Sequence, residues 1–393
     1  MALLALSTPA DQTVIDVDIV VAGGGPAGLL AAGQLAANWR VAVIDRGIIG
    51  ETTKYWVTSE RRLRMHGLAD CVLHRARALV VGTFLSGPVS ATGDLAVVDD
   101  HLLLHRLLDR CRVSDVMLFD SSPLLSFTWA EERLWVETTA GSFRARLLVD
   151  ATGGQSPIAA TFRLHRLDGF YGVYGRYLRD IDLRSPDVVL AYVEHLGNPP
   201  PIFEVIPCGE SSAYCAVFTY SRQLPPPRSL EEMFDTYCRH NQFFSTTAAT
   251  VLGPTKMGAI PIGRRTRKHL PGVTAIGEAA LIQPPLLGTA FNEILEYSKP
   301  ICAQLSSALA GSHGVPRSVS FRYPLLKRAQ DRLQLHMTRL LLRGNIETFD
   351  RLARFAQHLP DSALYNLCSN ELTWPQFVSA ALMFPVHALW SKG

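Results

Sequence analysis

The hydrophobic pattern near the start of the chain predicts a strand, a tight turn, a helix and a second strand. An apolar run at 15–22 leads into Gly23, Gly25 and Gly28, and another apolar run follows at 41–44. The small and apolar residues from Pro26 to about Asn38 predict the helix that joins the two strands. This unit is typical of a parallel sheet with helices packed against it.

Further along, the pattern alternates between helix and strand periods. Leucines at 102–104, 107 and 108, with charges between them, predict a helix over about 99–112. The runs that predict strands are 124–129, 134–138, 143–148, 188–193, 202–206, 214–220 and 273–276. A helix is expected from about 290 to 309. From about 319 to 390 the pattern is helical, with breaks expected at Gly344, Pro360, Pro375 and Pro385.

These elements predict an α/β protein with three parts. We expect a Rossmann-type nucleotide-binding domain at 15–160, with an inserted loop region at about 51–98, and its last part at 255–310. Residues 161–254 are expected to form an antiparallel β-sheet substrate domain. Residues 318–393 are expected to form a C-terminal helical region.

Composition narrows the class of protein. The chain has 393 residues and a net charge of +3, so no strong positive field indicates a nucleic-acid partner. The basic run at 264–269 is interpreted as a solvated loop. The seven cysteines form no CxxC pair, which favours free thiols in a reducing cytoplasm and indicates no metal site. No signal peptide or membrane-spanning stretch is evident, and peripheral membrane contact stays open.

The glycine turn has the chemistry of a nucleotide site. Gly23, Gly25 and Gly28 allow a tight turn, a close approach of backbone N–H groups to a pyrophosphate, and close packing of helix on strand. Asp45 ends the second strand, where a carboxylate can accept hydrogen bonds from an adenosine ribose.

Two further strand ends carry glycines, at Gly153 and Gly277. Three such ends fit FAD better than NAD, because the longer flavin needs separate contacts for its ribityl chain and its ring. We therefore expect bound FAD. The predicted cofactor-binding residues are Gly23, Gly25, Pro26, Ala27, Gly28, Asp45, Arg46, Asp150, Gly153, Gly277, Glu278, Gly288, Thr289 and Ala290.

Several segments resemble the lycopene cyclases of the plant and cyanobacterial type. They are Lys54–Val57 followed by Met65–Val72, the run Asp150-Ala151-Thr152-Gly153 with Ser156-Pro157, and Phe170–Val173. The resemblance covers nearly the whole chain. It implies an FAD-dependent enzyme that cyclises or isomerises an apolar isoprenoid or polyene without net redox change. It also implies that Glu278 holds the ribityl hydroxyls.

The acid of that family does not carry over. Lycopene cyclases have a Phe-Leu-Glu-Glu-Thr motif whose glutamate is thought to protonate the polyene, whereas the corresponding run 213–221 has no carboxylate. The best replacement is Glu204, because on a strand it alternates with Phe203 and Val205. A carboxyl that faces an apolar cavity has a raised pKa and can act as an acid. A solvent-facing Glu204 is the competing interpretation, and Glu194 and Glu293 are weaker candidates.

Two other functions stay open. One is an FAD-dependent monooxygenase or halogenase of secondary metabolism, in which Lys54 could imitate a halogenase lysine, although a solvated loop lysine is the simpler interpretation. The other is a flavin-bearing protein without catalysis. No second nucleotide motif is present, so a separate flavin reductase is a candidate partner for either enzyme.

Overall fold

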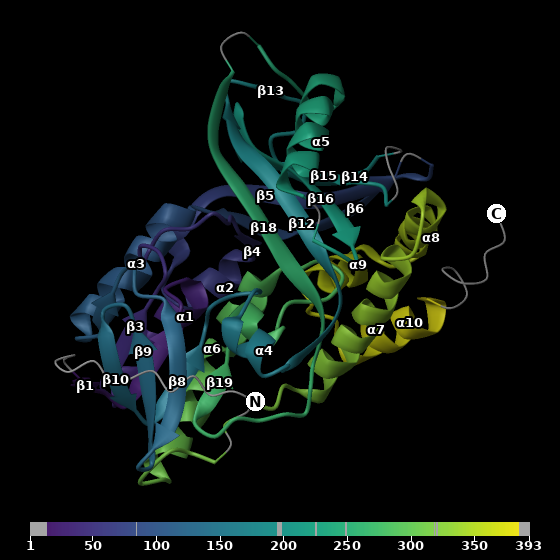
Figure 1. Ribbon diagram of the computed structural model, residues 1–393. Helices are drawn as coiled ribbons and strands as arrows, with labels where there is room; N and C mark the ends of the chain where they lie inside the picture. Colours follow the sequence, from purple (N-terminus) through teal and green to yellow (C-terminus); the bar gives the residue numbers. More distant parts are fainter. Residues whose placement is uncertain are drawn as a thin grey trace.

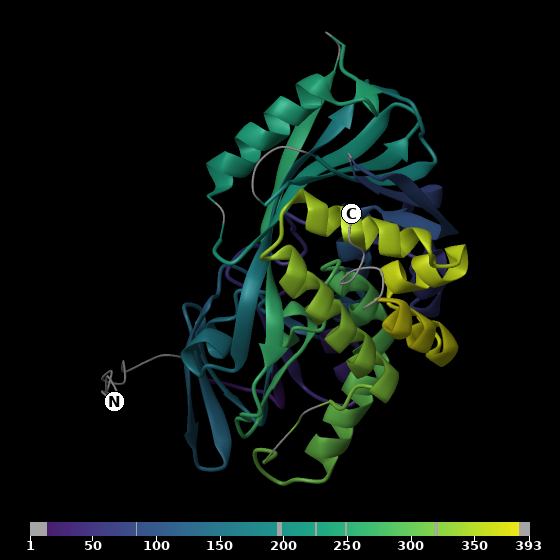
Figure 2. The same ribbon diagram turned by 90° about the vertical axis from the view of Figure 1, so that its right-hand side faces the viewer.

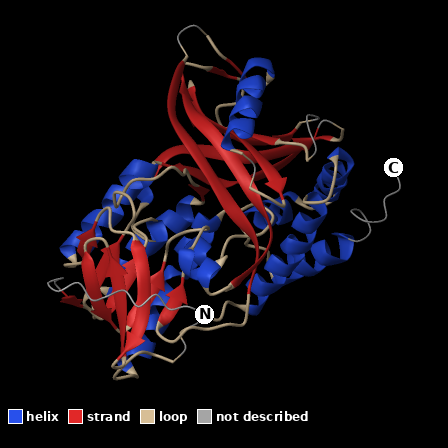
Figure 3. Ribbon diagram, in the orientation of Figure 1, coloured by secondary structure: helices blue, strands red, loops and turns tan. Residues whose placement is uncertain are grey.

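The computed structural model describes residues 14–83, 85–194, 199–224, 226–247, 250–317, 319 and 321–384. A parallel sheet with helices forms one end of the molecule, and a long, twisted, mainly antiparallel sheet forms the other (Figures 1 and 3). The last helices lie beside the long sheet. The predicted α/β class is confirmed.

The parallel sheet has five strands. In spatial order they are β19 (Val273–Ala275), β11 (Leu147–Asp150), β2 (Ile19–Ala22), β3 (Val41–Ile44) and β7 (Met117–Phe119). Every residue of β2, β3 and β11 is buried. Parallel strands are covered on both faces, which is why their sequences are continuous apolar runs.

Alternate residues of β2 enter two different cores. Ile19 and Val21 pack with helices α1 (Pro26–Leu35), α3 (Asp100–Val113) and α6 (Ala290–Ala310). Val20 and Ala22 pack against the other side. That side is covered by α4 (Pro157–Thr161) and by a four-stranded sheet with the order β1 (Val14–Asp16), β10 (Gly141–Ala145), β9 (Arg133–Thr138) and β8 (Leu124–Ala130).

The long sheet has eight strands. In spatial order they are β18 (Val251–Arg265), β12 (His165–Arg179), β16 (Ser212–Ser221), β15 (Ile202–Gly209), β14 (Val188–Val193), β5 (Val72–Thr83), β6 (Gly87–Val98) and β4 (Val57–Thr58). Only the β14–β5 pair is parallel. Helix α5 (Pro227–His240) covers one face through Leu230, Phe234 and Tyr237. Near its edge, β13 (Asp182–Leu183) pairs with β17 (Phe244–Ser245).

The structure differs from the sequence predictions in four places. The run 143–148 is two strands, because the backbone leaves one sheet at the buried Arg146 and enters the next. Residues 51–98 are not mainly loop: they include α2 (Glu60–Met65), the 3-10 turn η1 (Ala69–Cys71) and the long β5–β6 hairpin. β12 was not predicted, since its glycines and charged ends hide the strand pattern. β18 crosses the predicted boundary at 254, and the domain boundaries stay a prediction.

The C-terminal region, as far as the structure describes it, to Phe384, contains four helices (Figure 2). They are α7 (Leu325–Leu341), α8 (Ile346–Gln357), α9 (Asp361–Ser369) and α10 (Trp374–Phe384). Gly344 and Pro360 lie between helices, as predicted. Pro375 lies in the first turn of α10, where proline is tolerated, and Pro385 lies outside the described residues. None of the described helices is long and apolar enough to cross a bilayer.

Candidate active site

The glycine turn between β2 and α1 requires glycine at two positions. Gly23 has a φ of +116°, and a Cβ added there would lie 2.2 Å from the carbonyl oxygen of Ala151. A Cβ at Gly28 would lie 1.9 Å from the carbonyl oxygen of Gly23. A Cβ at Gly25 would instead meet nothing within 4 Å, so open space lies in front of this turn. Pro26 and Ala27 start α1, whose N-terminus favours an anion there.

Asp45 holds the end of β3 to this turn. Its Oδ2 accepts a hydrogen bond from the Gly24 amide (2.5 Å), and its Oδ1 accepts one from the Gly47 amide (2.7 Å). The carboxylate therefore lies beside the glycine turn, where we predicted the ribose contact. Arg46, next in the chain, is exposed. The roles of both residues in cofactor binding stay predictions.

The second glycine end is organised by Asp150. This carboxylate is only 1% exposed, and it accepts hydrogen bonds from the amide and hydroxyl of Thr152 (3.1 and 2.6 Å) and from the hydroxyl of Ser156 (2.5 Å). Burial raises the pKa of Asp150. Its side chain thus shapes the turn that contains Gly153, which has a φ of +84°.

The turn at Gly277, after β19, brings Glu278 next to the turn at Gly153 and Gly154. Gly277 has a φ of +59°, and a Cβ there would lie 2.8 Å from Cβ of Ala27. The Glu278 carboxylate accepts a hydrogen bond from the Gly154 amide (3.2 Å), and both of its oxygens lie 2.6 Å from Nζ of Lys54. Lys54 is therefore ion-paired with a predicted cofactor-binding residue, not a purely solvated loop lysine.

The start of α6 contributes the last of the predicted cofactor-binding residues, and it lies at the same edge of the parallel sheet as the glycine turns. Gly288 has a φ of +67°, Thr289 precedes the helix and Ala290 begins it. The hydroxyl of Thr289 and Oδ1 of Asn292 are buried and have no hydrogen-bond partner among the described residues. Together with the open space at Gly25, these orphaned groups fit a long dinucleotide that extends from α1 to α6.

An apolar cavity of about 360 Å³ begins at this edge and continues along the inner face of the long sheet. Its volume lies in the range usual for ligand pockets. The cavity is bounded by the loop Thr53–Trp56, by residues of all eight strands of the long sheet, by the start of α6 and by α7, α8 and α9. The strand residues in its wall are Val57, Thr58, Leu79, Val81, Thr83, Leu95, Tyr171, Val173, Val189, Ala191, Val193, Ile202, Glu204, Ile206, Tyr214, Phe218, Tyr220, Lys256, Met257, Gly258 and Ile260.

Glu204 lies in this wall, on β15. The hydroxyl of Tyr55 donates a hydrogen bond of 2.8 Å to its Oε2. Burial raises the pKa of Glu204 to about 7, and the hydrogen bond from Tyr55 limits that rise. At neutral pH a substantial fraction of this carboxyl is therefore protonated. The competing interpretation, in which Glu204 faces solvent, is therefore wrong, because Glu204 faces the cavity.

Two tyrosines accompany the carboxyl. The ring centroids of Tyr55 and Tyr214 are 3.5 Å apart, and the Tyr214 hydroxyl is buried without a hydrogen-bond partner among the described residues. Sequence reasoning did not single out either tyrosine. The signal was the length of the polar and aromatic segment after the second strand, because such loops commonly carry function.

The loop that carries Tyr55 is fixed by a second lysine. Lys256 on β18 forms an ion pair with Asp100 and donates to the backbone carbonyls of Thr52 (3.4 Å) and Lys54 (3.3 Å). Lys256 is 7% exposed. Its buried charge thus holds the loop against the sheet, at a position that no sequence motif indicated.

The other candidates do not line the cavity. Glu293 is buried on α6, where it pairs with Lys327 (3.2 Å) and accepts a hydrogen bond from Asn370 (3.0 Å). Glu194 lies just after β14, outside the cavity wall. Of the aromatic residues of β12, Tyr171 belongs to that wall, whereas Phe170, Tyr174 and Tyr177 do not.

A nucleotide-binding sheet that adjoins a largely apolar cavity has the arrangement of a flavoprotein with a small-molecule pocket beside its cofactor site. The chain matches the model of the lycopene cyclase protein family over residues 18–392 and belongs to that family. The predicted resemblance is therefore confirmed. FAD is the cofactor, and the residues described above fit it. No curated protein matches the chain closely enough to count as a relative.

Solved structures share the fold at low sequence identity. A geranylgeranyl bacteriochlorophyll reductase-like protein from Thermoplasma acidophilum is 14% identical, with a TM-score of 0.67 over 93% of this chain and 98% of that chain. The flavin-dependent brominase Bmp2 is 12% identical, with a TM-score of 0.65 over 94% and 98%. The halogenase PltM, solved with phloroglucinol and FAD, is 13% identical, with a TM-score of 0.59 over 93% and 86%.

A side chain at Gly25 should prevent FAD binding without disturbing the apoprotein. In Gly25→Leu the new side chain enters the open space in front of the turn, where we expect the pyrophosphate. Purified protein should lose its flavin absorbance while its apo melting temperature stays unchanged. Gly33→Ala is the matched control, because its Cβ would meet only Cys111 Sγ, at 3.8 Å. Retention of FAD at full stoichiometry by Gly25→Leu would contradict the assignment.

Removing the Tyr55 hydroxyl should raise the pKa of Glu204 above about 7, because the lost hydrogen bond favours the ionised form. An infrared titration of the carboxyl band in Tyr55→Phe measures this shift. Tyr214→Phe is the control, since its hydroxyl makes no hydrogen bond among the described residues. An unchanged pKa in Tyr55→Phe, or equal shifts in both variants, would show that the hydrogen bond does not set the pKa.

Proposed function

We propose that this protein cyclises or isomerises an apolar isoprenoid or polyene, with Glu204 as the general acid. The observation that carries the proposal is a carboxyl with a pKa of about 7 in the wall of a largely apolar cavity that adjoins the predicted cofactor site. Family membership supports the reaction class. General acids work best when their pKa lies near the working pH.

The proposed reaction balances without an oxidant. The Glu204 carboxyl gives its proton to one carbon of a double bond, which forms a C–H bond and leaves a carbocation on the other carbon. A second double bond of the same substrate attacks this carbocation and forms the ring C–C bond. Loss of a proton from a neighbouring carbon to the Glu204 carboxylate forms the product double bond and restores the acid.

The two oxygens of the carboxyl have different surroundings. Oε2 accepts the hydrogen bond from Tyr55, and no described residue bonds to Oε1. We propose that Oε1 carries the transferred proton, while Tyr55 fixes the carboxyl orientation and stabilises the carboxylate after transfer. Tyr55 is half-buried, and both desolvation of its hydroxyl and the nearby Glu204 raise the pKa of that hydroxyl, which therefore remains a donor.

The aromatic and apolar residues of the cavity wall would stabilise the carbocation intermediate and shield it from water. Tyr55, Trp56, Phe218 and Phe291 present aromatic rings to the cavity, and Trp56 stacks on Phe291 with centroids 5.1 Å apart. Ring faces attract positive charge, and the apolar lining excludes water that would quench a carbocation. FAD in its reduced form, when bound, supplies negative charge next to the cavity.

A redox reaction is the second candidate function. The fold is shared with halogenases, and Lys54 lines the cavity in an ion pair with Glu278. A monooxygenase or halogenase would need reduced flavin and oxygen access. For either function we propose electron supply by a separate reductase and action in the cytoplasm, with the apolar substrate as partner.

Replacing the acid should remove turnover without unfolding the protein. Glu204→Gln should slow the reaction roughly 10²-fold or more, because the amide cannot donate the required proton. In the unaltered protein, activity should be highest at low pH and fall as pH rises through about 7, since the raised pKa keeps the acid protonated only below that value. Glu210→Gln, on the exposed end of the same hairpin, is the control. Full activity of Glu204→Gln would remove Glu204 from the mechanism.

An anaerobic assay separates cyclisation from redox chemistry. Enzyme reduced with dithionite should turn over repeatedly without oxygen, and mass spectrometry should show a product with the mass of the substrate. Candidate isoprenoid extracts serve as substrate, with the apoprotein as the blank. A requirement for oxygen, with the gain of one oxygen or halogen atom per product, would instead establish the second function.

A further inference from the structure

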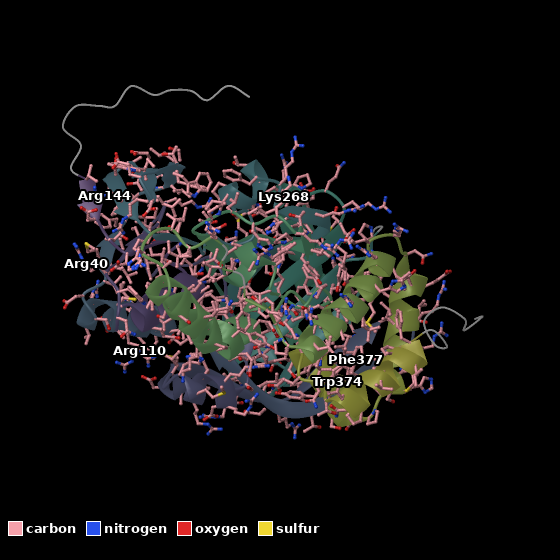
Figure 4. The ribbon with its side chains drawn as sticks, turned by 90° about the horizontal axis from the view of Figure 1, so that it is seen from below. Arg40, Arg110, Arg144, Lys268, Trp374 and Phe377 are labelled. Carbon is pink, nitrogen blue, oxygen red and sulfur yellow. The ribbon has the colours of Figure 1, made fainter. Side chains whose placement is uncertain are left out.

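Helix α10 carries a row of exposed apolar side chains. Trp374, Val378 and Leu382 are spaced about one helical turn apart and are 47%, 49% and 70% exposed. The helix has no charged residue, and its opposite side is buried at Ala380 and Phe384. Figure 4 shows Trp374 and Phe377 beside the C-terminal helices. A continuous exposed apolar row of this kind marks a contact surface.

A basic row runs along the neighbouring helix. Arg328, Arg332 and His336 are exposed on successive turns of α7. The two helices lie side by side, because Gln330 donates to the Leu372 carbonyl just before α10 (2.7 Å) and the rings of His336 and Phe384 are 6.1 Å apart. Within the described ranges neither arginine forms an ion pair with a carboxylate.

The charged groups around these rows leave the basic row uncompensated. Asp331, the acid nearest along α7, pairs with Lys327 (2.7 Å). Glu371, just before α10, pairs with Arg62 (2.9 Å) and with Arg61. The positive charge of the two arginines therefore faces outward next to the apolar row.

The surface lies close to the cavity. The cluster that buries the inner side of α10 contains Met337, Phe355, Leu364 and Leu367, and these four residues also belong to the cavity wall. One layer of side chains thus separates the exposed helix from the space in which we place the apolar substrate.

We propose that the outer faces of α10 and α7 dock on a bilayer that contains anionic lipids. The apolar row enters the boundary between headgroups and acyl chains, and Arg328 and Arg332 contact the anionic headgroups. A membrane with anionic lipids fits this surface best, because the basic row of α7 lies beside the apolar row of α10. The reason for docking, access to a membrane-dissolved substrate, rests on the proposed function.

Vesicle co-sedimentation of the FAD-loaded full chain, without substrate, tests the docking. Binding should be strong to vesicles of equal parts phosphatidylcholine and phosphatidylserine, weak to phosphatidylcholine alone, and reduced by salt. The triple variant Trp374→Ser, Val378→Ser, Leu382→Ser should bind at least about tenfold more weakly. Arg328→Glu with Arg332→Glu should lose about fivefold per arginine on the mixed vesicles.

Matched variants elsewhere should bind as the unaltered protein does. Val113→Ser with Leu125→Ser removes exposed apolar side chains, and Arg40→Glu with Lys268→Glu reverses exposed charges on the nucleotide-binding half (Figure 4). Unchanged binding of the triple serine variant, or equal losses in the controls, would overturn the proposal. So would a dimer in gel filtration that the serine substitutions dissociate, because a second copy would then cover this face.

Two further variants separate the alternatives. A chain that ends at Phe384 lacks residues 385–393, which lie outside the described residues, and should still bind the mixed vesicles. Complete loss of its binding would assign the docking to those residues and overturn the proposal. Glu204→Gln should bind vesicles normally, so failure of the acid and failure of the docking are distinguishable.

Discussion

Two adjacent residues of one loop connect the cofactor site to the cavity. Lys54 pairs with Glu278, a predicted cofactor-binding residue, and Tyr55 donates to Glu204 in the cavity wall. Because the residues are consecutive, the loop cannot move one contact without disturbing the other. Lys256 and Asp100 fix the same loop from the sheet and from α3. The relative position of Glu278 and Glu204, and hence of the flavin and the acid in our proposal, therefore depends on a few charge-assisted contacts.

The chemistry of the cavity follows from incomplete compensation of one buried carboxyl. An ionised carboxylate in apolar surroundings is costly unless it is paired or accepts several hydrogen bonds. Glu293 has a lysine and an asparagine, and Asp150 accepts three hydrogen bonds, so both serve the structure. Glu204 accepts one hydrogen bond from the described residues, from the neutral hydroxyl of Tyr55, and its pKa is about 7. The same residue type thus has different roles, which its surroundings decide.

The cavity is assembled from parts of the chain that are remote in sequence. The long sheet supplies one wall, the start of α6 supplies the flavin end, and α7, α8 and α9 close the remaining side. The C-terminal helices therefore have two functions in our interpretation: they exclude water from the cavity and present the exposed rows of α7 and α10 to lipid. Both follow from helices whose inner faces are apolar and whose outer faces carry an apolar row on α10 and a basic row on α7.

The sequence by itself determined the nucleotide site and much of the fold. A glycine turn needs particular residues at fixed spacing, because Gly23 and Gly28 have no room for a side chain, and the buried parallel strands are continuous apolar runs. The sequence also indicated Glu204, since it is a lone acid on an apolar strand. Only the tertiary structure placed Tyr55 and Tyr214 beside Glu204, Lys54 beside Glu278, and Lys256 against the loop that carries Lys54 and Tyr55. Tyr55 and Glu204 are 149 positions apart in the sequence, and Lys54 and Glu278 are 224 positions apart. No local sequence pattern can predict contacts between residues so far apart. The long strands β5, β12 and β18 escaped prediction because glycine, proline or charged residues interrupt their local pattern, so that pairing with neighbouring strands decides their structure.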